Sequence, residues 1–281
     1  MLKSKKKKLQ KLSLNIKLKI LETIFRVKKG HIGGTYSVLD ILVYLFFSNT
    51  FKLDKKNFRS KNNDVVVLSK GHAALAIYSV LYEKKISKHY NYNYFNKKNR
   101  SLLEHPTVTK NTPELIFDTG SLGHSLGVCA GMAFANKINS AKKKLIAILG
   151  DGELYEGSNW ESLMFIAHYK LNNLLVIIDR NELITLDKTE QVIKLESLKK
   201  KFSSFNFDVK EINGHDYNQL EKNISLFKRN KKIKPMVIIC NTIKGKGVSL
   251  FEKNLKFHHA VPSTNEFNKA KVELKQKIEN L

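Results

Sequence analysis

Two short polar segments have the residue types and the spacing of a divalent-metal site. Gly150-Asp151-Gly152 follows the apolar run 145–149, and Asn181 closes the next apolar run after 28 intervening residues. If a helix returns the chain to the same sheet edge, the Asp151 carboxylate and the Asn181 amide oxygen can share one Mg²⁺ or Ca²⁺. The backbone carbonyl of Leu183 would complete the protein's ligands. The glycines would let a phosphate approach the backbone closely.

Three histidines stand in glycine- or proline-containing segments of the kind that forms turns. The segments are KGHIGG (29–34), LSKGHA (68–73) and EHP (104–106), which contain His31, His72 and His105. Taken alone, each histidine is more often a surface or structural residue. Three of them at such turns make a purely structural role for all of them unattractive.

Two further segments are rich in glycine, namely TGSLGHSLG (119–127) and TIKGKGV (242–248), and the second is followed by FHH (257–259). A lone Gly-Asp-Gly or a lone glycine-rich turn is common in ordinary loops. Here several occur in one chain, and no nicotinamide fingerprint, P-loop or zinc-type cysteine spacing competes with them. The combination favours a site for phosphate and metal.

In their order along the chain, these segments resemble the motifs of transketolases, and residues 150–186 resemble the thiamine-diphosphate signature of that family. The resemblance covers nearly the whole chain. It implies thiamine diphosphate and Mg²⁺ or Ca²⁺ as cofactors, with metal ligands from Asp151, Asn181 and Leu183. It also implies that His31, His105 and His258 face a sugar phosphate and move protons at its hydroxyls. The expected cofactor-binding residues are His72, Gly120, Ser121, Leu122, Gly150, Gly152, Glu156, Asn181 and His258.

Two assignments within this resemblance keep an alternative. His259 competes with His258 as the ligand, and His258 is favoured because it directly follows the aromatic Phe257. Glu156 resembles an acidic family position at the subunit contact, although a carboxylate at a helix N-terminus is also common for purely structural reasons.

The segments between the motifs alternate between strand and helix patterns. The predicted strands are 65–68, 145–149, 174–178, 207–212 and 235–240. The predicted helices are 9–29, one from residue 37, one after residue 72, 157–169, 217–228 and one from residue 264. Strands that are apolar on both faces need helices on both sides, so the sequence predicts an α/β fold with a mainly parallel sheet. Ligands of such sheets bind at the carboxyl ends of the strands, where the polar motifs stand.

Composition narrows the class of protein further. No linker divides the 281 residues, so residues 1–281 are expected to form one thiamine-diphosphate-binding domain with a basic tail over 1–8. The net charge is +25, but only 5 of the 50 cationic residues are Arg and the Lys are dispersed, which argues against nucleic acid as a partner. Residues 86–100 read as a surface excursion.

The cysteines and the apolar runs bear on the compartment. Cys129 and Cys240 lie far apart in apolar runs and are expected to be buried, reduced thiols. The N-terminus does not have the pattern of a secretory signal, and no apolar run is long enough to cross a membrane. A cytoplasmic protein is therefore expected.

The resemblance also indicates what this chain lacks. In transketolases a second domain binds the pyrimidine ring and supplies a Glu that protonates it, whereas only about thirty residues follow TIKGKGV here. The implied partner is a C-terminal transketolase subunit in a hetero-oligomer, and the implied reaction is transfer of a two-carbon ketol unit between sugar phosphates. The alternatives are half of another thiamine enzyme, such as deoxyxylulose-phosphate synthase, an inactive cofactor-binding remnant, and a basic nucleic-acid-binding protein.

Overall fold

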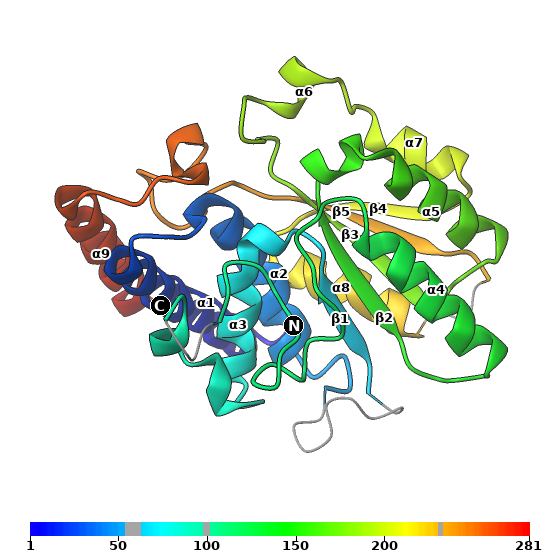
Figure 1. Cartoon of the computed structure of the whole chain (residues 1–281), viewed down its shortest axis with the longest axis horizontal. Helices are drawn as coiled ribbons and strands as arrows, with labels where there is room; N and C mark the ends of the chain where they lie inside the picture. The colour runs from blue at the N-terminus through cyan, green and yellow to red at the C-terminus, as the bar shows by residue number, and fades with distance from the viewer. Residues whose placement is uncertain (54–62, 98–101, 230–232) are drawn as a thin grey trace.

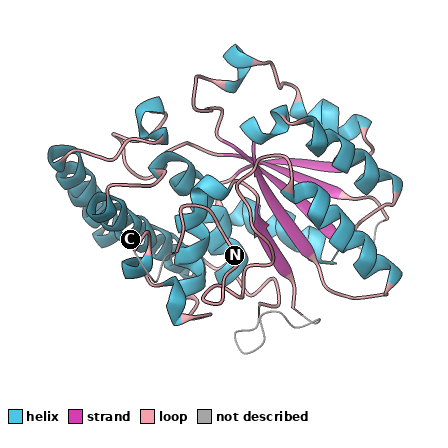
Figure 2. Ribbon diagram, viewed as in Figure 1, coloured by secondary structure: helices cyan, strands magenta, loops and turns pink. Residues whose placement is uncertain are grey.

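Five parallel strands form one sheet in the described part of the chain. The computed structural model describes residues 1–53, 63–97, 102–229 and 233–281. The strands are β1 (Val65–Leu68), β2 (Leu145–Gly150), β3 (Leu174–Arg180), β4 (Asp208–Asn213) and β5 (Met236–Asn241). Their order across the sheet is β1-β2-β3-β5-β4, and every pairing is parallel. Figure 2 shows their carboxyl ends gathered near the centre of the molecule.

Helices cover both faces of this sheet, as predicted (Figure 1). One layer contains α4 (Ser125–Ile138), α5 (Gly157–His168) and α7 (Leu198–Ser204), which share a core with one face of the strands. The opposite layer contains α1 (Lys3–Val27), α2 (Ile32–Phe47), α3 (Ala74–Glu83), α8 (Tyr217–Arg229) and α9 (Thr264–Glu279). The short α6 (Thr189–Val192) lies in the connection between β3 and α7.

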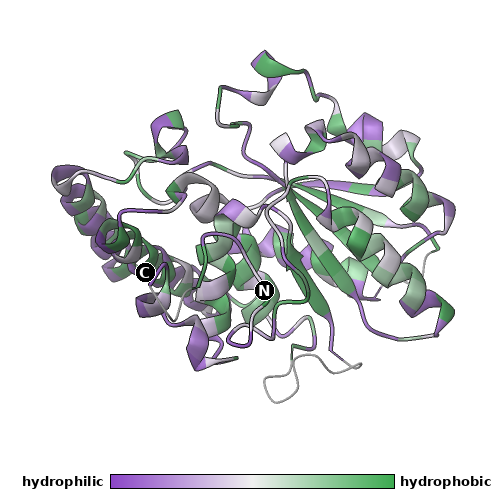
Figure 3. Cartoon of the chain, viewed as in Figure 1, coloured by the Kyte–Doolittle hydropathy of each residue, from purple (hydrophilic) through white to green (hydrophobic). Residues whose placement is uncertain are grey.

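The alternation of side chains along each strand separates the two cores. In β2, Ile146 and Ile148 belong to the α1–α2 side, whereas Leu145 and Leu149 belong to the α4–α5 side. All six residues of β2 are buried, as expected for a strand covered on both faces. The central strand β2 is accordingly coloured as hydrophobic over most of its length in Figure 3, whereas edge strand β4 has a mixed sequence and is largely unburied. Burial on both faces therefore explains why the run in β2 is continuously apolar.

Every predicted strand is present, with ends shifted by at most two residues, but the N-terminal helix differs from the prediction. The expectation of a basic tail over residues 1–8 is wrong from Lys3 onward, because α1 begins there. Lysine is a good helix former. The Met1 ammonium also pairs with Glu221 at 2.6 Å, and the Lys5 ammonium donates to the Ser48 carbonyl at 3.0 Å. The start of the chain is thereby held against α2 and α8.

Two further helices, α2 and α4, differ from the prediction. The second helix is predicted from residue 37, but α2 begins five residues earlier, at Ile32. The Ser37 hydroxyl donates to the Asp179 carboxylate at 2.6 Å, across the interior of the protein. Helix α4 was not predicted, because Gly127 and Gly131 give its sequence the composition of a turn.

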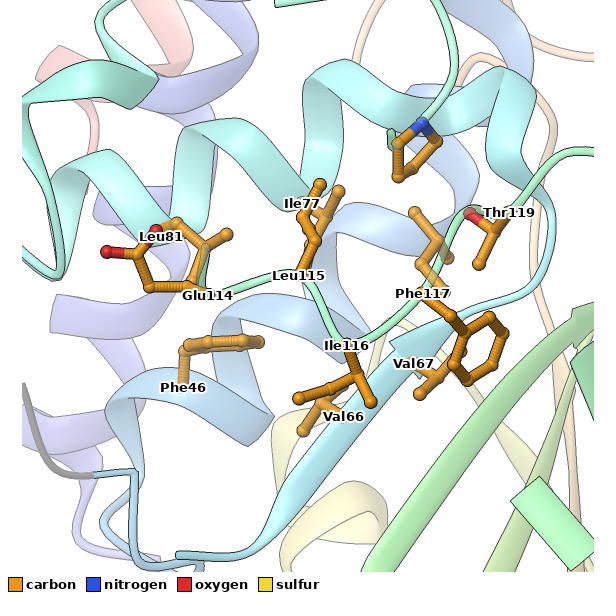
Figure 4. Close-up of a pocket in the computed structure, with 12 residues that line it drawn as sticks. Phe46, Val66, Val67, Ile77, Leu81, Glu114, Leu115, Ile116, Phe117 and Thr119 are labelled. Atoms are coloured by element: carbon orange, nitrogen blue, oxygen red, sulfur yellow. The ribbon is translucent and has the colours of Figure 1, made fainter. Parts of the chain in front are cut away.

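Residues 86–97 pack more closely than a surface excursion, and residues 98–100 lie outside the described part. Tyr90 is buried, its ring stacks on Tyr78 at 5.8 Å, and its hydroxyl donates to Glu114 at 2.9 Å. The nearby stretch 114–117 covers edge strand β1, with Ile116 lying against Val66 (Figure 4). Only about 20 Å³ of free volume remains there, so this contact is part of the core.

Both cysteines are buried free thiols, as predicted. Burial raises the pKa of Cys129 to about 12, so its thiol is protonated and unreactive at neutral pH. None of the helices in the described residues combines the length and the apolar character that a membrane span requires.

Candidate functional site

A cavity of about 280 Å³ opens at the carboxyl ends of the strands. Residues that follow β1, β2, β3 and β5 meet in it, together with the first turn of α2. Its lining residues are Gly34, Lys70, His72, Leu122, Gly150, Asp151, Gly152, Glu153, Tyr155, Asn181, Leu183, Ile184, Thr185, Leu186, Lys244 and His258. The motifs that were singled out in the sequence therefore converge on one place.

Asp151 and Asn181 lie at the same edge of the sheet, as their spacing predicted. The Asp151 carboxylate is 2% exposed and accepts from the Gly152 amide at 2.9 Å and the Glu182 amide at 2.6 Å. Burial raises its pKa, and Arg180 opposes this with an ion pair at 3.3 Å. The Asn181 amide oxygen accepts from the Leu183 amide at 3.2 Å. Two hard oxygen donors are thus held rigidly beside the cavity.

Two buried lysines line the same cavity, although nothing in the sequence selected them separately. The Lys70 ammonium pairs with Asp179 at 2.5 Å, and both side chains are at most 1% exposed. The Lys244 ammonium donates to the carbonyls of Leu183 at 2.9 Å and Ile184 at 3.2 Å. Burial lowers the pKa of Lys244 to about 8. Lys70 lies in the LSKGHA segment and Lys244 in the TIKGKGV segment. Their place in these motifs was the only sign in the sequence that they belong to the site.

Glu153, rather than Glu156, is the buried acid beside the Gly-Asp-Gly turn. Its carboxylate accepts from the Ser69 hydroxyl and from the amides of Gly123 at 3.1 Å and Gly150 at 3.3 Å. These contacts tie the glycine-rich turn to the ends of β1 and β2. Glu156 is exposed and does not line the cavity. The position of Glu156 alone does not support its assignment to the cofactor.

The glycine-rich segment 119–127 places only part of its predicted cofactor-binding residues in the cavity. Leu122 lines it, whereas Gly120 and Ser121 do not. Gly120 has φ +128°, and a Cβ atom there would lie 2.5 Å from Cδ2 of His105. Only glycine allows the backbone to take this conformation so close to the imidazole. Gly120 therefore serves to place His105.

Four histidines gather around His31, and two of them, His72 and His258, line the cavity. The His31 ring lies 4.5 Å from His259, 5.6 Å from His72, 5.8 Å from His258 and 6.4 Å from His105, between centroids. Burial, with His259 and His105 nearby, lowers the pKa of His31 to about 4. Its Nδ1 atom is buried and has no hydrogen-bond partner among the described residues. His31 is thus neutral and able to bond to a ligand.

The geometry distinguishes His258 from His259. His258 lines the cavity, and its Nδ1 atom accepts from the Lys244 ammonium at 2.6 Å. Its Nε2 atom must then carry the proton, which it donates to the Thr185 hydroxyl at 3.2 Å. Burial and the Lys244 charge lower the pKa of His258 to about 3, so it is neutral at pH 7. His259 is exposed, and its ring meets that of His31 edge-on, with an interplanar angle of 63°.

These residues suit a diphosphate and a metal ion. Lys244, His72 and His258 offer N–H donors or cationic character to phosphate oxygens, while Asp151 and Asn181 offer oxygen ligands to a hard cation. The Nδ1 atom of His31 is buried and has no hydrogen-bond partner among the described residues, as expected of an atom that bonds to a polar ligand. The donor set is therefore compatible with thiamine diphosphate and Mg²⁺ or Ca²⁺.

Comparison with known proteins agrees with this geometry. Residues 9–279 match the family model of the transketolase, thiamine diphosphate binding domain. The chain is 37% identical over 264 residues to one of the subunits of the apulose-4-phosphate transketolase of Phocaeicola vulgatus, covering 94% of this chain and 92% of that one. Human transketolase is 33% identical over 230 residues, which are 82% of this chain but 36% of the human protein.

Comparison with solved structures indicates the same family. The transketolase of Campylobacter jejuni superposes with a TM-score of 0.84 at 28% identity, covering 95% of this chain and 42% of that one. The match extends along nearly all of this chain, whereas more than half of the longer enzyme has no counterpart in it. The chain therefore belongs to the transketolase family, in which it corresponds to the N-terminal, thiamine-diphosphate-binding part.

Proposed function

We propose that the chain is the cofactor-holding subunit of a heteromeric transketolase that moves a two-carbon ketol unit between sugar phosphates. The observation that carries the proposal is the convergence of Asp151, Asn181 and Lys244 with the histidine cluster in one cavity. The family assignment supports an enzyme subunit of the transketolase type. We expect no nucleic-acid partner, because the lysines are dispersed along the sequence, and the buried thiols suit a cytoplasmic location.

The cofactor would occupy the inner end of the cavity. Asp151, Asn181 and the Leu183 carbonyl would hold Mg²⁺ or Ca²⁺, and the carbonyl keeps a lone pair for it beside the Lys244 ammonium. His72, His258 and Lys244 would bind the diphosphate. When bound, thiamine diphosphate supplies a nucleophilic carbon at C2 of its thiazolium ring.

The clustered histidines would act on the sugar. His31 is neutral and partly buried, and its Nδ1 atom has no partner among the described residues, so it can accept a proton from a substrate hydroxyl. His105 is exposed beside it and is fixed by Gly120. His258 would offer its Nε2–H to the same region in place of its bond to the Thr185 hydroxyl, since Lys244 fixes its tautomer. The three imidazoles would thus bind and orient the substrate hydroxyls and exchange protons with them.

A partner subunit would complete the site. Several relatives of similar length are called transketolase subunits, whereas the single-chain transketolases are much longer than this chain. Edge strand β1 is covered by residues 114–117, so we do not place the partner at this edge. An exposed apolar face lies instead on α4 and α5, where Val128 is 45%, Met164 51% and Phe165 37% exposed. This face starts beside the 120–124 turn, so we place the partner there.

The decisive experiment is reconstitution with a C-terminal transketolase subunit, using xylulose 5-phosphate as donor and ribose 5-phosphate as acceptor. We expect the purified chain to be inactive alone and the mixture to turn over in proportion to complex formed. Gly131→Leu should block association, because a Cβ atom at this α4 position meets nothing within 4 Å in the described part of the chain. Val272→Glu on α9, also exposed, is the control and should associate normally. Full turnover by the single chain would contradict the proposal.

A further inference from the structure

A buried polar network lies behind the cavity, centred on Asp40 of α2. Its carboxylate is 6% exposed and accepts from the hydroxyls of Ser13 at 2.6 Å and Tyr217 at 3.1 Å. His215 adds a third contact, with Nδ1 at 2.7 Å, and Lys17 pairs with the same carboxylate at 3.4 Å. Although burial opposes ionisation, Lys17 and His215 hold the pKa of Asp40 well below its usual range.

The geometry fixes the tautomer of His215. Its Nε2 atom lies 2.9 Å from the backbone nitrogen of Ile243, which has only a proton to donate. Nε2 must therefore be the acceptor, and Nδ1 must carry the proton that it donates to Asp40. The ionised carboxylate favours this tautomer. The imidazole thus links Asp40 of α2 to the backbone of the segment 242–247 through one hydrogen bond at each ring nitrogen.

That segment carries Lys244 into the cavity. The Gly245 amide donates to the Gly33 carbonyl at 3.0 Å, and the Ile243 amide donates to His215, so the backbone is held on both sides of Lys244. The side-chain stem runs tightly against α2, where a Cβ atom on Gly33 would lie 2.9 Å from Cγ of Lys244. A shift of this backbone would consequently move the ammonium away from His258 and the Leu183 carbonyl.

We propose that His215 is a positioning residue, which holds the 242–247 segment through the Ile243 amide and so sets the Lys244 ammonium for an anionic ligand. His215 does not line the cavity itself. The network joins Asp40 to a residue 175 positions away, and it connects α2 with the end of β5. The part of the inference that concerns diphosphate rests on the proposed function, whereas the anchoring of the segment does not.

Two substitutions separate the contacts of His215. In His215→Asn the short amide can still donate to Asp40 but cannot reach Ile243. In His215→Gln the longer side chain can place its oxygen near the former Nε2 atom and accept from the Ile243 amide. Ser13→Ala is the matched control, because it removes a different hydrogen bond from Asp40 and leaves the Ile243 contact unchanged.

Hydrogen exchange of the unliganded chain tests the anchoring directly. We expect His215→Asn to raise amide exchange in residues 242–247 by about tenfold, or ~1.4 kcal/mol of opening free energy. His215→Gln should remain near the wild type, and Ser13→Ala should leave this segment unchanged even if it lowers the melting temperature. Equal protection of the segment in His215→Asn and Ser13→Ala would overturn the inference.

Calorimetry with thiamine diphosphate and Mg²⁺ tests the consequence. His215→Asn should weaken binding by about tenfold, while His215→Gln and Ser13→Ala stay close to the wild type. Increased exchange with unchanged affinity would show that His215 anchors the segment without serving the site, which also overturns the inference. If the wild type itself binds no thiamine diphosphate, the proposed function fails, and the exchange data still decide whether His215 anchors the segment.

Discussion

Replacing Lys70 with Met tests how much the buried ion pair under the cavity contributes to stability. The Lys70 ammonium lies 2.5 Å from Asp179, with side-chain exposures of 1% and 0%. The substitution leaves the Asp179 carboxylate buried, with the hydroxyls of Ser37 and Thr242 as its remaining side-chain donors among the described residues. Loss of one partner from a fully buried pair costs ~3–5 kcal/mol, because the remaining charge is desolvated without compensation.

The double variant Lys70→Met/Asp179→Asn removes both charges; the Asn amide keeps an oxygen for one of the two hydroxyls and turns its NH₂ to the other, which can accept from it. We expect it to lose only ~1–2 kcal/mol, since the side-chain hydrogen bonds that remain are neutral. The two single variants would then sum to far more than the double variant. The interaction energy in the cycle should exceed ~2 kcal/mol, well above the ~0.5 kcal/mol expected for independent sites.

Urea unfolding followed by far-UV circular dichroism measures these differences, provided that the m-values stay equal. The matched control is Lys19→Met, which breaks the pair between Lys19 and Glu83. That pair is also short, at 2.7 Å, but its side chains are 46% and 19% exposed. An exposed pair contributes at most ~1 kcal/mol. Additive single variants, or equal losses for Lys70→Met and Lys19→Met, would refute the argument from burial.

Three further predictions concern ligands and partners. Asp151→Ala should abolish calorimetric binding of thiamine diphosphate with Mg²⁺, as should EDTA, whereas Lys142→Ala in a surface run should bind normally; undiminished binding in EDTA would argue against the metal site. Lys244→Met should weaken binding by at least about tenfold, because it removes a buried cation, while the partly exposed Lys246→Met should not. RNA binding in an electrophoretic shift assay should be weak and lost in salt, and a salt-resistant, sequence-specific complex would contradict the dispersed-charge interpretation.

The strands and most of the longer helices could be predicted because their signals are local. The runs 65–68 and 145–149 are continuously apolar, and Figure 3 shows the strand formed by the second run coloured as hydrophobic over most of its length. The placement of Asp151 and Asn181 at one edge of the sheet could be predicted because they follow adjacent parallel strands, whose carboxyl ends lie at the same edge. Helix α4 escaped prediction because the glycines in it have low helix propensity, which tertiary packing overrides.

The sequence alone thus determined the fold class, the family and the convergence of the motifs, since hydrophobic period, turn residues and motif order are all readable along the chain. Only the tertiary structure brought Glu153, which the sequence had not singled out, to the cavity and showed that His258 rather than His259 lines it. It also brought His215 to the backbone beside Lys244. These choices depend on burial and on donor–acceptor geometry between residues far apart in the chain, which no local pattern encodes.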